Sequence, residues 1–314
     1  MSPPRPNLFL IGSMKSGTSY LSHLLAAHPE IFMSSPKEPC HFVDPRVLRH
    51  AWPGIWRQGY WRSQERYLSL FKAAQDVAVI AEASTVYSKL PMFSGVPERI
   101  LDFNPQARFI YIMRDPVERA ISHYWHRVRW WGERRSLLTA LRHDPQYADV
   151  SHYARQLKGY LQYVGRERIC VLTLEELHAD LAGQMRRMYA WLGVEASFQP
   201  PPLEPVNVRP QLLEQVRGFG LLDRLRKLGW YGRSAFFLPQ RARKFAARLA
   251  ARPVRPAEVS VLDACDYLRS RQMRETAELS ELLQRTFLEW TTLYGRGEPE
   301  VALIDEDTPR QWQA

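Results

Sequence analysis

Short unbroken runs of apolar residues are the most regular feature of the first two thirds of the chain. They occupy residues 8–11 and 77–81, and a shorter run lies at 31–33. Residues 108–113 and 169–174 are apolar except for Arg108 and Thr173. A continuous apolar run of this length is typical of a strand that is buried on both faces. We therefore predict five strands in this part of the chain.

Helical patterns lie between these runs. Apolar residues within 20–25 have the spacing of one helix face. Asp115 is a good N-cap and Pro116 suits a first helical position, which predicts a helix over residues 116–129. A third helical stretch follows the last strand and continues to Gly193. Strands that alternate with helices predict an α/β fold with a P-loop-like parallel sheet, in which ligands bind beyond the carboxyl ends of the strands.

The pattern changes in the last third of the chain. Prolines cluster at 200–205, residues 222–252 are strongly basic with a mostly helical pattern, and residues 273–294 predict an amphipathic helix. The basic stretch is either a solvated helix face or a surface for an anion or a peripheral membrane contact. We expect an α/β core over residues 1–205 and a helical, basic extension over 206–314 that completes the same domain.

Composition narrows the class of protein. The chain has 314 residues, a formal net charge of +10 and 12% aromatic residues, which suits one large core and anionic partners. Cys40, Cys170 and Cys265 form no metal or disulfide pattern, which suits a reducing compartment. Since we find no secretory signal and no apolar run of roughly 18 residues, we expect a cytoplasmic protein.

Residues 12–19, the N-terminal loop, are the first candidate site. Gly12 ends the first strand, Lys15 follows, and Gly17 comes just before the first helix. A strand, a glycine-bounded loop and a helix aim backbone N–H groups and a positive helix end at one point, which predicts a phosphate site. Because Lys15 precedes the second glycine, the loop is not a Walker A motif. An ordinary turn of small residues is the alternative.

A second candidate anion site lies at the end of the fourth strand. Arg114 follows that strand, and Ser122 lies about two turns into the next helix. An arginine fork and a hydroxyl could bind a second phosphate, although Arg114 could also pair with Glu118 or Glu82. With the N-terminal loop, this pair indicates a nucleotide that carries phosphates at two places.

Residues 46–66 alternate tryptophan and tyrosine with arginine. Such a segment either stacks on sugars or bases, or forms a surface subdomain that its own aromatic rings hold together.

Four motifs resemble those of one enzyme family. Residues 12–19 resemble the 5′-phosphosulfate loop of sulfotransferases, and residues 114–122 resemble their 3′-phosphate motif. Residues 37–42 are similar to the Lys-Glu-x-His-Phe-Phe stretch of the branch that includes heparan sulfate sulfotransferases. Residues 82–87 resemble the Glu-x-(Ser/Thr)-Pro-x-Tyr element of that branch. The similarity covers roughly residues 7–195, with the motifs in the expected order.

The chain departs from the branch at several motif positions. Cys40 stands in the place of the motif histidine, and His41 in that of an aromatic residue. Thr85 replaces the proline, and Ala83 stands where heparan enzymes carry a lysine of the catalytic site. These departures argue against close functional identity with heparan enzymes and leave the expected sulfuryl transfer unchanged.

The resemblance implies a donor, 3′-phosphoadenosine 5′-phosphosulfate (PAPS), which leaves as 3′-phosphoadenosine 5′-phosphate (PAP). It places the donor on Lys15, Ser16, Gly17, Thr18, Ser19, Arg114 and Ser122. Lys15 would stabilise charge on the leaving oxygen, by analogy with phosphoryl transfer. Glu38 would be the general base and His41 its rival. Glu82 would orient Lys15, bind acceptor or pair with an arginine, and no metal is expected.

The implied acceptor is a hydroxyl group, most plausibly of a carbohydrate or glycolipid. One alternative is a P-loop-type kinase, which would need a lysine directly before Ser or Thr and a Walker B aspartate. Another is a non-enzymatic nucleic-acid-binding protein, which would leave both anion motifs unexplained. We expect no nucleic acid partner, and the sequence indicates no oligomeric state.

Overall fold

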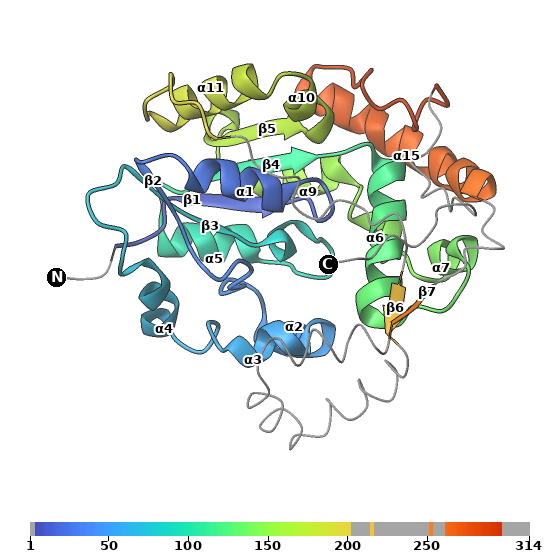
Figure 1. Cartoon of the computed structure of the whole chain (residues 1–314), viewed down its shortest axis with the longest axis horizontal. Helices are drawn as coiled ribbons and strands as arrows, with labels where there is room; N and C mark the ends of the chain where they lie inside the picture. The colour runs from blue at the N-terminus through green and yellow to red at the C-terminus, as the bar shows by residue number, and fades with distance from the viewer. Residues whose placement is uncertain (1–3, 202–213, 217–250, 254–260, 297–314) are drawn as a thin grey trace, which may run out of the picture.

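The computed structural model describes residues 4–201, 214–216, 251–253 and 261–296. Five parallel strands form one sheet in the order β2-β3-β1-β4-β5 (Figure 1). The strands are β1 (Leu8–Gly12), β2 (Ile31–Met33), β3 (Val79–Ala83), β4 (Arg108–Met113) and β5 (Ile169–Thr173). In the central register Leu10 lies opposite Ala83 on one side and Ile110 on the other. The predicted α/β fold with a P-loop-like parallel sheet is confirmed.

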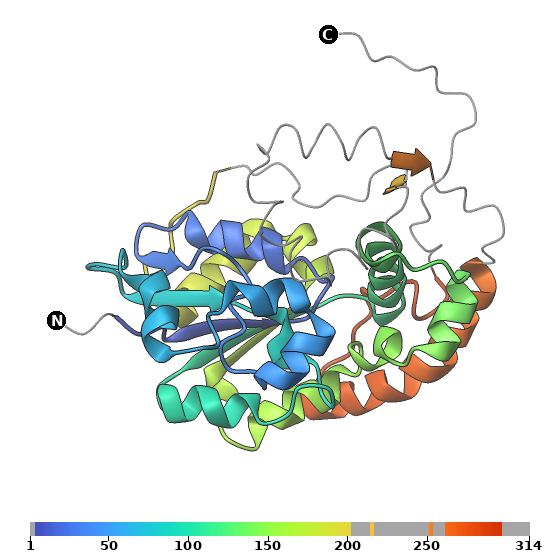
Figure 2. The same ribbon diagram turned by 90° about the horizontal axis from the view of Figure 1, so that it is seen from below.

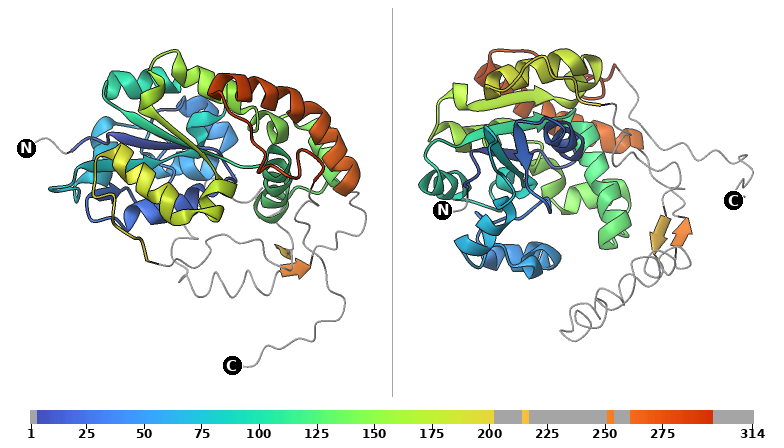
Figure 3. Two further views of the ribbon diagram at one scale, coloured as in Figure 1. Left: turned by 90° about the horizontal axis from the view of Figure 1, so that it is seen from above. Right: turned by 60° about the vertical axis from the view of Figure 1, so that its left-hand side comes forward.

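Helices cover both faces of this sheet (Figures 1 and 3). On one face, α1 (Thr18–Ala26) and α11 (Leu181–Leu192) bury leucines and methionines against alternate strand residues such as Leu8 and Leu10. On the other face, α5 (Val96–Phe103) and α9 (Tyr153–Leu161) pack on a core rich in aromatic rings, which includes Phe9 and Phe109. Because side chains alternate along a strand, each strand supplies both cores.

Shorter elements connect and flank this framework. They are α2 (Pro45–Ala51), α3 (Pro53–Gln58), α4 (Gln64–Leu68), η1 (Ser69–Phe71), η2 (Thr85–Ser88), α7 (Leu137–His143), α8 (Gln146–Asp149), η3 (Arg166–Arg168) and α10 (Leu174–Ala179).

The predicted helix that begins at Pro116 is α6 (Pro116–Trp131), and the side chain of Asp115 caps it. The last long helix, α15 (Val261–Leu283), packs against α6, α7, α8 and α9 (Figure 2).

The third predicted strand is displaced by two residues. We expected a strand over 77–81 with Glu82 just beyond its end, but β3 runs from Val79 to Ala83. Glu82 lies inside the strand, opposite Phe9, and is fully buried. The prediction was wrong because a glutamate rarely occupies a strand position that faces the core.

The amphipathic helix predicted over 273–294 is also corrected. Helix α15 begins much earlier and ends at Leu283, and Gln284 has φ 52°. Phe287 and Trp290 lie beyond the helix, where their rings stack at 4.2 Å and are fully buried. Their apolar spacing indicated a helix face, but these rings instead fill the aromatic core from a turn.

Most of the predicted basic helix at 222–252 lies outside the described residues. Its last two positions belong to strand β7 (Ala251–Pro253), which pairs antiparallel with β6 (Glu214–Val216), so the helical expectation was wrong there. The division into residues 1–205 and 206–314 stays a prediction. In the parts of the chain that the structure describes, no helix is both long and apolar enough to cross a membrane.

Candidate active site

The N-terminal loop requires glycine at two positions. Gly12 has φ +148°, and a Cβ atom there would lie 2.1 Å from the hydroxyl oxygen of Ser88. Gly17 has φ +82°, and a Cβ atom there would lie 2.5 Å from a methyl carbon of Leu174. Gly17 is also the N-cap of α1, and no side chain caps this helix. The first amides of α1 therefore lack a side-chain acceptor, and a helix end of this kind binds anions.

Lys15 is a half-buried cation in this loop, with a left-handed backbone at φ 71°. Burial and, after it, the positive charges of Arg114 and Arg129 lower the pKa of Lys15 to about 8. No carboxylate among the described residues forms an ion pair with Lys15. A cation among other cations is stabilised when an anion binds beside it.

The loop hydroxyls have a partner that the sequence analysis did not assign to the site. The ammonium of Lys37 donates to Thr18 Oγ1 at 2.9 Å and to Ser19 Oγ at 3.0 Å. Ser16 is fully buried, with its hydroxyl near that of Tyr153. Lys37 therefore joins the segment that carries Glu38 to the N-terminal loop. Its place directly before Glu38 in the motif was the signal that could have identified it.

Glu38 lies beside the end of β3, where its N–H donates to the carbonyl of Ala83 at 2.9 Å. The carboxylate accepts the N–H and the hydroxyl of Thr85, each at 2.9 Å. A proline at position 85 has no N–H to donate, so the departure from the family motif adds a hydrogen bond to Glu38. The Cys40 thiol is 3.8 Å from the same carboxylate.

His41 belongs to the aromatic core. Its ring stacks on Tyr67 with 4.2 Å between centroids, and its Nδ1 lies 2.7 Å from the carbonyl oxygen of Tyr60. Burial lowers the pKa of His41. These contacts describe a packed ring, and the choice between Glu38 and His41 as base stays a prediction.

Glu82 faces the aromatic core and has none of the cationic partners that we considered. Burial raises the pKa of Glu82 to about 8, and the phenol groups of Tyr87 and Tyr67 oppose part of this rise. Neither phenol reaches ordinary hydrogen-bond geometry with the carboxyl group, and Glu82 forms no hydrogen bond to Lys15 or an arginine. Glu82 therefore does not orient Lys15 through a hydrogen bond, nor does it pair with an arginine.

Arg114 lies at the end of β4, as expected. Its Nη2 is 3.2 Å from Glu118 Oε2, which is one of the pairings that the sequence left open. The other carboxylate oxygen of Glu118 accepts the hydroxyl of Thr292 at 3.1 Å. Ser122 is half-buried one turn further along α6. A phosphate at Arg114 would have to share this guanidinium with Glu118.

The aromatic and basic segment at 46–66 is largely held together by its own side chains. Trp56 and Trp61 stack with centroids 5.3 Å apart, Arg49 lies over Trp56, and Arg62 lies over Trp61. This arrangement agrees with the surface-subdomain interpretation for these rings. Trp52 is different, because it packs on residues outside the segment.

Two cavities lie away from the N-terminal loop. One of about 520 Å³ is lined by Arg46, Val47, His50, Ala51, Met92 and Gln146. Another of about 800 Å³ is lined by residues 280–281 and 284–286. Within the described residues, no group of three or more His, Cys, Asp or Glu side chains is placed to bind a metal.

Comparisons with known proteins bear on the family and the fold of the chain. A model of the sulfotransferase family matches residues 6–200. The structure of a sulfotransferase from Alicyclobacillus acidocaldarius is similar with a TM-score of 0.64 and 26% identity, and the similarity covers 91% of this chain and 99% of that one.

Two curated relatives match over shorter stretches. Human heparan sulfate glucosamine 3-O-sulfotransferase 6 is 27% identical over 198 residues, which are 60% of this chain and 53% of the relative. The membrane-associated sulfotransferase kil1 of Dictyostelium discoideum is 33% identical over 125 residues, which are 40% of this chain and 24% of the relative. The chain thus spans about half of the first relative and a quarter of the second. Because the family match covers more than half of the chain and includes the loop, Glu38 and Arg114, this protein belongs to the sulfotransferase family.

Proposed function

We propose that this protein transfers the sulfuryl group of PAPS to a hydroxyl group of a carbohydrate or glycolipid and releases PAP. The observation that carries the proposal is Lys15, a half-buried ammonium without a carboxylate partner among the described residues, beside a helix end that no side chain caps. A phosphosulfate supplies the negative charge that this arrangement lacks.

The residues around the loop can divide the chemistry between them. As the acceptor oxygen forms a bond to sulfur, the bond from sulfur to the bridging oxygen breaks, and PAP leaves with that oxygen. Lys15 stabilises the negative charge that develops on the bridging oxygen. Glu38, held by two hydrogen bonds from Thr85, accepts the proton of the acceptor hydroxyl.

Membership of the family indicates only the general class of acceptor. The human relative is named for sulfation of a glucosamine hydroxyl in heparan sulfate, which favours a sugar hydroxyl for this chain also. Because the chain departs from the heparan motifs at Cys40, Ala83 and Thr85, its acceptor need not be heparan sulfate.

Calorimetric titration with PAP tests the donor site. We expect Lys15→Ala and Arg114→Ala each to weaken PAP binding by about 10- to 100-fold, because each removes a charged hydrogen bond to phosphate. Lys158→Ala is the matched control, since Lys158 is exposed on α9 and pairs with Glu278. Unchanged affinity in both site variants would refute the donor site.

Donor turnover tests the base. With ³⁵S-labelled PAPS and a panel of sugar acceptors, Glu38→Gln should bind PAP normally and lose at least 100-fold in turnover. His41→Gln should retain most of the turnover, because the His41 ring packs in the aromatic core. The opposite result would transfer the role of base to His41.

A further inference from the structure

A second lysine near the loop is buried without an anion. Lys89 follows η2 directly and is only 5% exposed. Its ammonium contacts the sulfur of Met14 at 3.1 Å and lies 4.1 Å from the ring centre of Trp52. No carboxylate within the described ranges forms an ion pair with it. A thioether and an aromatic face attract a cation but do not neutralise it, so the site lacks a negative charge.

Lys89 lies on the side of the proposed base. Burial lowers the pKa of Lys89 to about 8, and the negative charge of Glu38 is the strongest influence that opposes this lowering. The charges that lower the pKa of Lys15 belong to other residues, led by Arg114. The charges of both lysines also reach His126, so the two ammonium groups border one region of the molecule. Since Glu38 influences Lys89 and not Lys15, we assign Lys15 to the donor and Lys89 to the acceptor.

Aromatic rings extend from Lys89 to the surface. Trp52 stacks on Phe93 with 5.4 Å between centroids, and its edge packs against Trp131 at 6.1 Å and 86°. Trp131 is the last residue of α6 and is 43% exposed, so part of its ring is open to a ligand. The row from Trp131 through Trp52 to Lys89 and Met14 thus connects the surface to the N-terminal loop.

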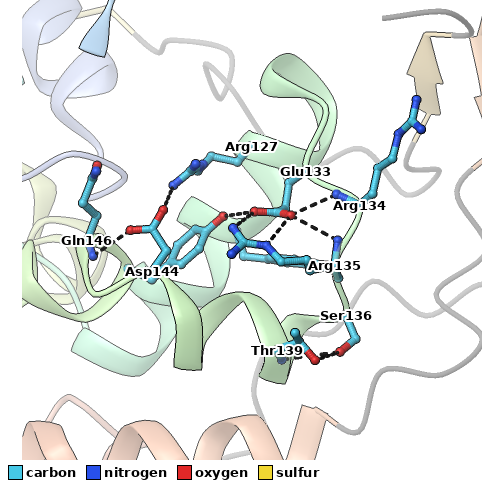
Figure 4. Close-up of polar contacts among 10 residues, drawn as sticks. Arg127, Glu133, Arg134, Arg135, Ser136, Thr139, Asp144 and Gln146 are labelled. Carbon is cyan, nitrogen blue, oxygen red and sulfur yellow. Dashed lines mark hydrogen bonds and ion pairs between the residues drawn. The ribbon is translucent and has the colours of Figure 1, made fainter. Parts of the chain in front are cut away.

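The turn that follows Trp131 is held by a polar network (Figure 4). Glu133 accepts hydrogen bonds from the side chain of Arg135 at 2.9 Å and from the hydroxyl of Tyr147 at 3.2 Å. Arg127, one turn before the end of α6, pairs with Asp144. These contacts fix the end of α6, so the exposed ring is presented by a preorganised element.

From these observations we propose that Lys89, Trp52 and Trp131 form the acceptor site and that the acceptor is an acidic sugar. Its carboxylate, phosphate or sulfate group pairs with Lys89, and a sugar ring packs on the exposed face of Trp131. The hydroxyl to be sulfated then points toward Glu38, which accepts its proton. This inference rests on the proposed sulfuryl transfer and specifies its substrate.

Paired sugars test the role of the charge. The PAP-saturated protein is titrated with p-nitrophenyl β-D-glucuronide and with p-nitrophenyl β-D-glucoside, and glycosides that bear a 6-phosphate or 6-sulfate are compared with the same neutral parent. We expect at least one acidic sugar to bind about tenfold or more tightly than its parent. Lys89→Met should abolish that preference and leave PAP affinity unchanged, whereas Lys158→Met should preserve both. Trp131→Ala should weaken the acidic and neutral sugars alike.

Several results would overturn the proposal. These are equal binding of acidic and neutral sugars by the wild type, binding of none of them, or a preference that survives in Lys89→Met. Turnover that falls equally for both kinds of sugar in Lys89→Met, with the preference in binding retained, would place Lys89 at the sulfuryl group instead. Failure of the wild type to bind PAP would refute the proposed function itself and is measured separately. Methionine is an unbranched side chain only one heavy atom shorter than lysine, and Lys89→Met removes a buried charge that forms no ion pair, so we expect the variant to fold.

Discussion

At the scale of single residues, the proposed donor site predicts that the titration of Lys15 limits donor binding at high pH. Its pKa of about 8 means that Lys15 is protonated below pH 7 and loses its proton above pH 8. Since the anionic donor needs the protonated form, PAP affinity should be nearly constant from pH 7 to 8 and then fall by up to about tenfold per pH unit.

Lys15→Arg distinguishes this explanation from a general effect of pH. A guanidinium stays protonated over this range, so the variant should bind PAP with little change up to pH 10. Calorimetry at half-unit steps of pH measures both proteins. The same loss of affinity in Lys15→Arg as in the wild type would assign the titration to another group.

The backbone of the loop makes a separate prediction at Gly12. An alanine there would require φ +148° and would bring its Cβ within 2.1 Å of the Ser88 hydroxyl, so the loop must move. We expect Gly12→Ala to weaken PAP binding at least tenfold. Gly54→Ala is the control, because a Cβ at Gly54 meets no atom within 4 Å. Equal PAP affinity in the two variants would show that the loop tolerates the change.

The positions of the motif residues in the fold were predictable from the strands that they follow. Lys15, Glu38 and Arg114 lie at the sheet edge that their positions after strands predicted. The function of Thr85 was not predictable, because only the fold brings its N–H and hydroxyl to Glu38, 47 positions away in sequence. Lys89 likewise gave no signal, since its burial depends on Trp52 and Met14 from two other segments.

At the scale of elements, Asp115 connects the start of α6 to the segment after α15. One of its oxygens accepts the amides of Val117 and Glu118, and the other accepts the amide of Leu293 at 2.8 Å. Asp115→Ala removes the cap and this long-range bond together. We expect it to lower the free energy of unfolding by about 2–3 kcal/mol.

A matched variant isolates the long-range part of that effect. Asp44 caps α2 through a single bond to the amide of Arg46 on the surface, so Asp44→Ala should cost only about 1 kcal/mol. Urea unfolding of both variants gives the difference. Equal losses would mean that the bond to Leu293 adds no stability.

The elements differ in how far their sequence determines them. The strands at 108–113 and 169–174 were predictable almost to the residue, because both are almost entirely apolar and lie between clear turn or helix signals. Helix α15 was not, since the spacing of Phe287 and Trp290 fits a helix face as well as a packed turn. Periodicity records which side chains are buried, and the tertiary contacts decide which backbone buries them.

At the scale of the whole molecule, two buried lysines lie near the sheet edge, and burial makes their positive charges unfavourable. Lys15 and Lys89 both have lowered pKa values and no carboxylate partner in the described part of the chain. With a net charge of +10, the chain offers little compensation. Under the proposed function, these buried cations lower the stability of the free protein and are stabilised when anionic substrates bind, a trade that active sites commonly make.

The buried carboxyl group of Glu82 makes the global stability of the protein decrease as pH rises. Its pKa is raised from 4.5 to about 8 by burial, so the folded state keeps a proton that the unfolded state releases above pH 4.5. The free energy of unfolding should then decrease as pH rises from about 4.5 to 8 and change no further from this group above pH 8. Glu82→Gln keeps the shape of the neutral side chain and removes the titration.

Compared with the wild type, Glu82→Gln should therefore have similar stability at pH 5 and be more stable at pH 8, by an amount on the order of a few kcal/mol. Urea midpoints at pH 5, 6, 7 and 8 measure this difference. Glu65→Gln, at an exposed position on α4, controls for the loss of one negative charge on the surface. A difference between Glu82→Gln and wild type that stays constant from pH 5 to 8 would mean that Glu82 is ionised in the folded protein. A charged partner within the aromatic core would then be required, and the nearest groups with which Glu82 interacts, Tyr67 and Tyr87, supply none.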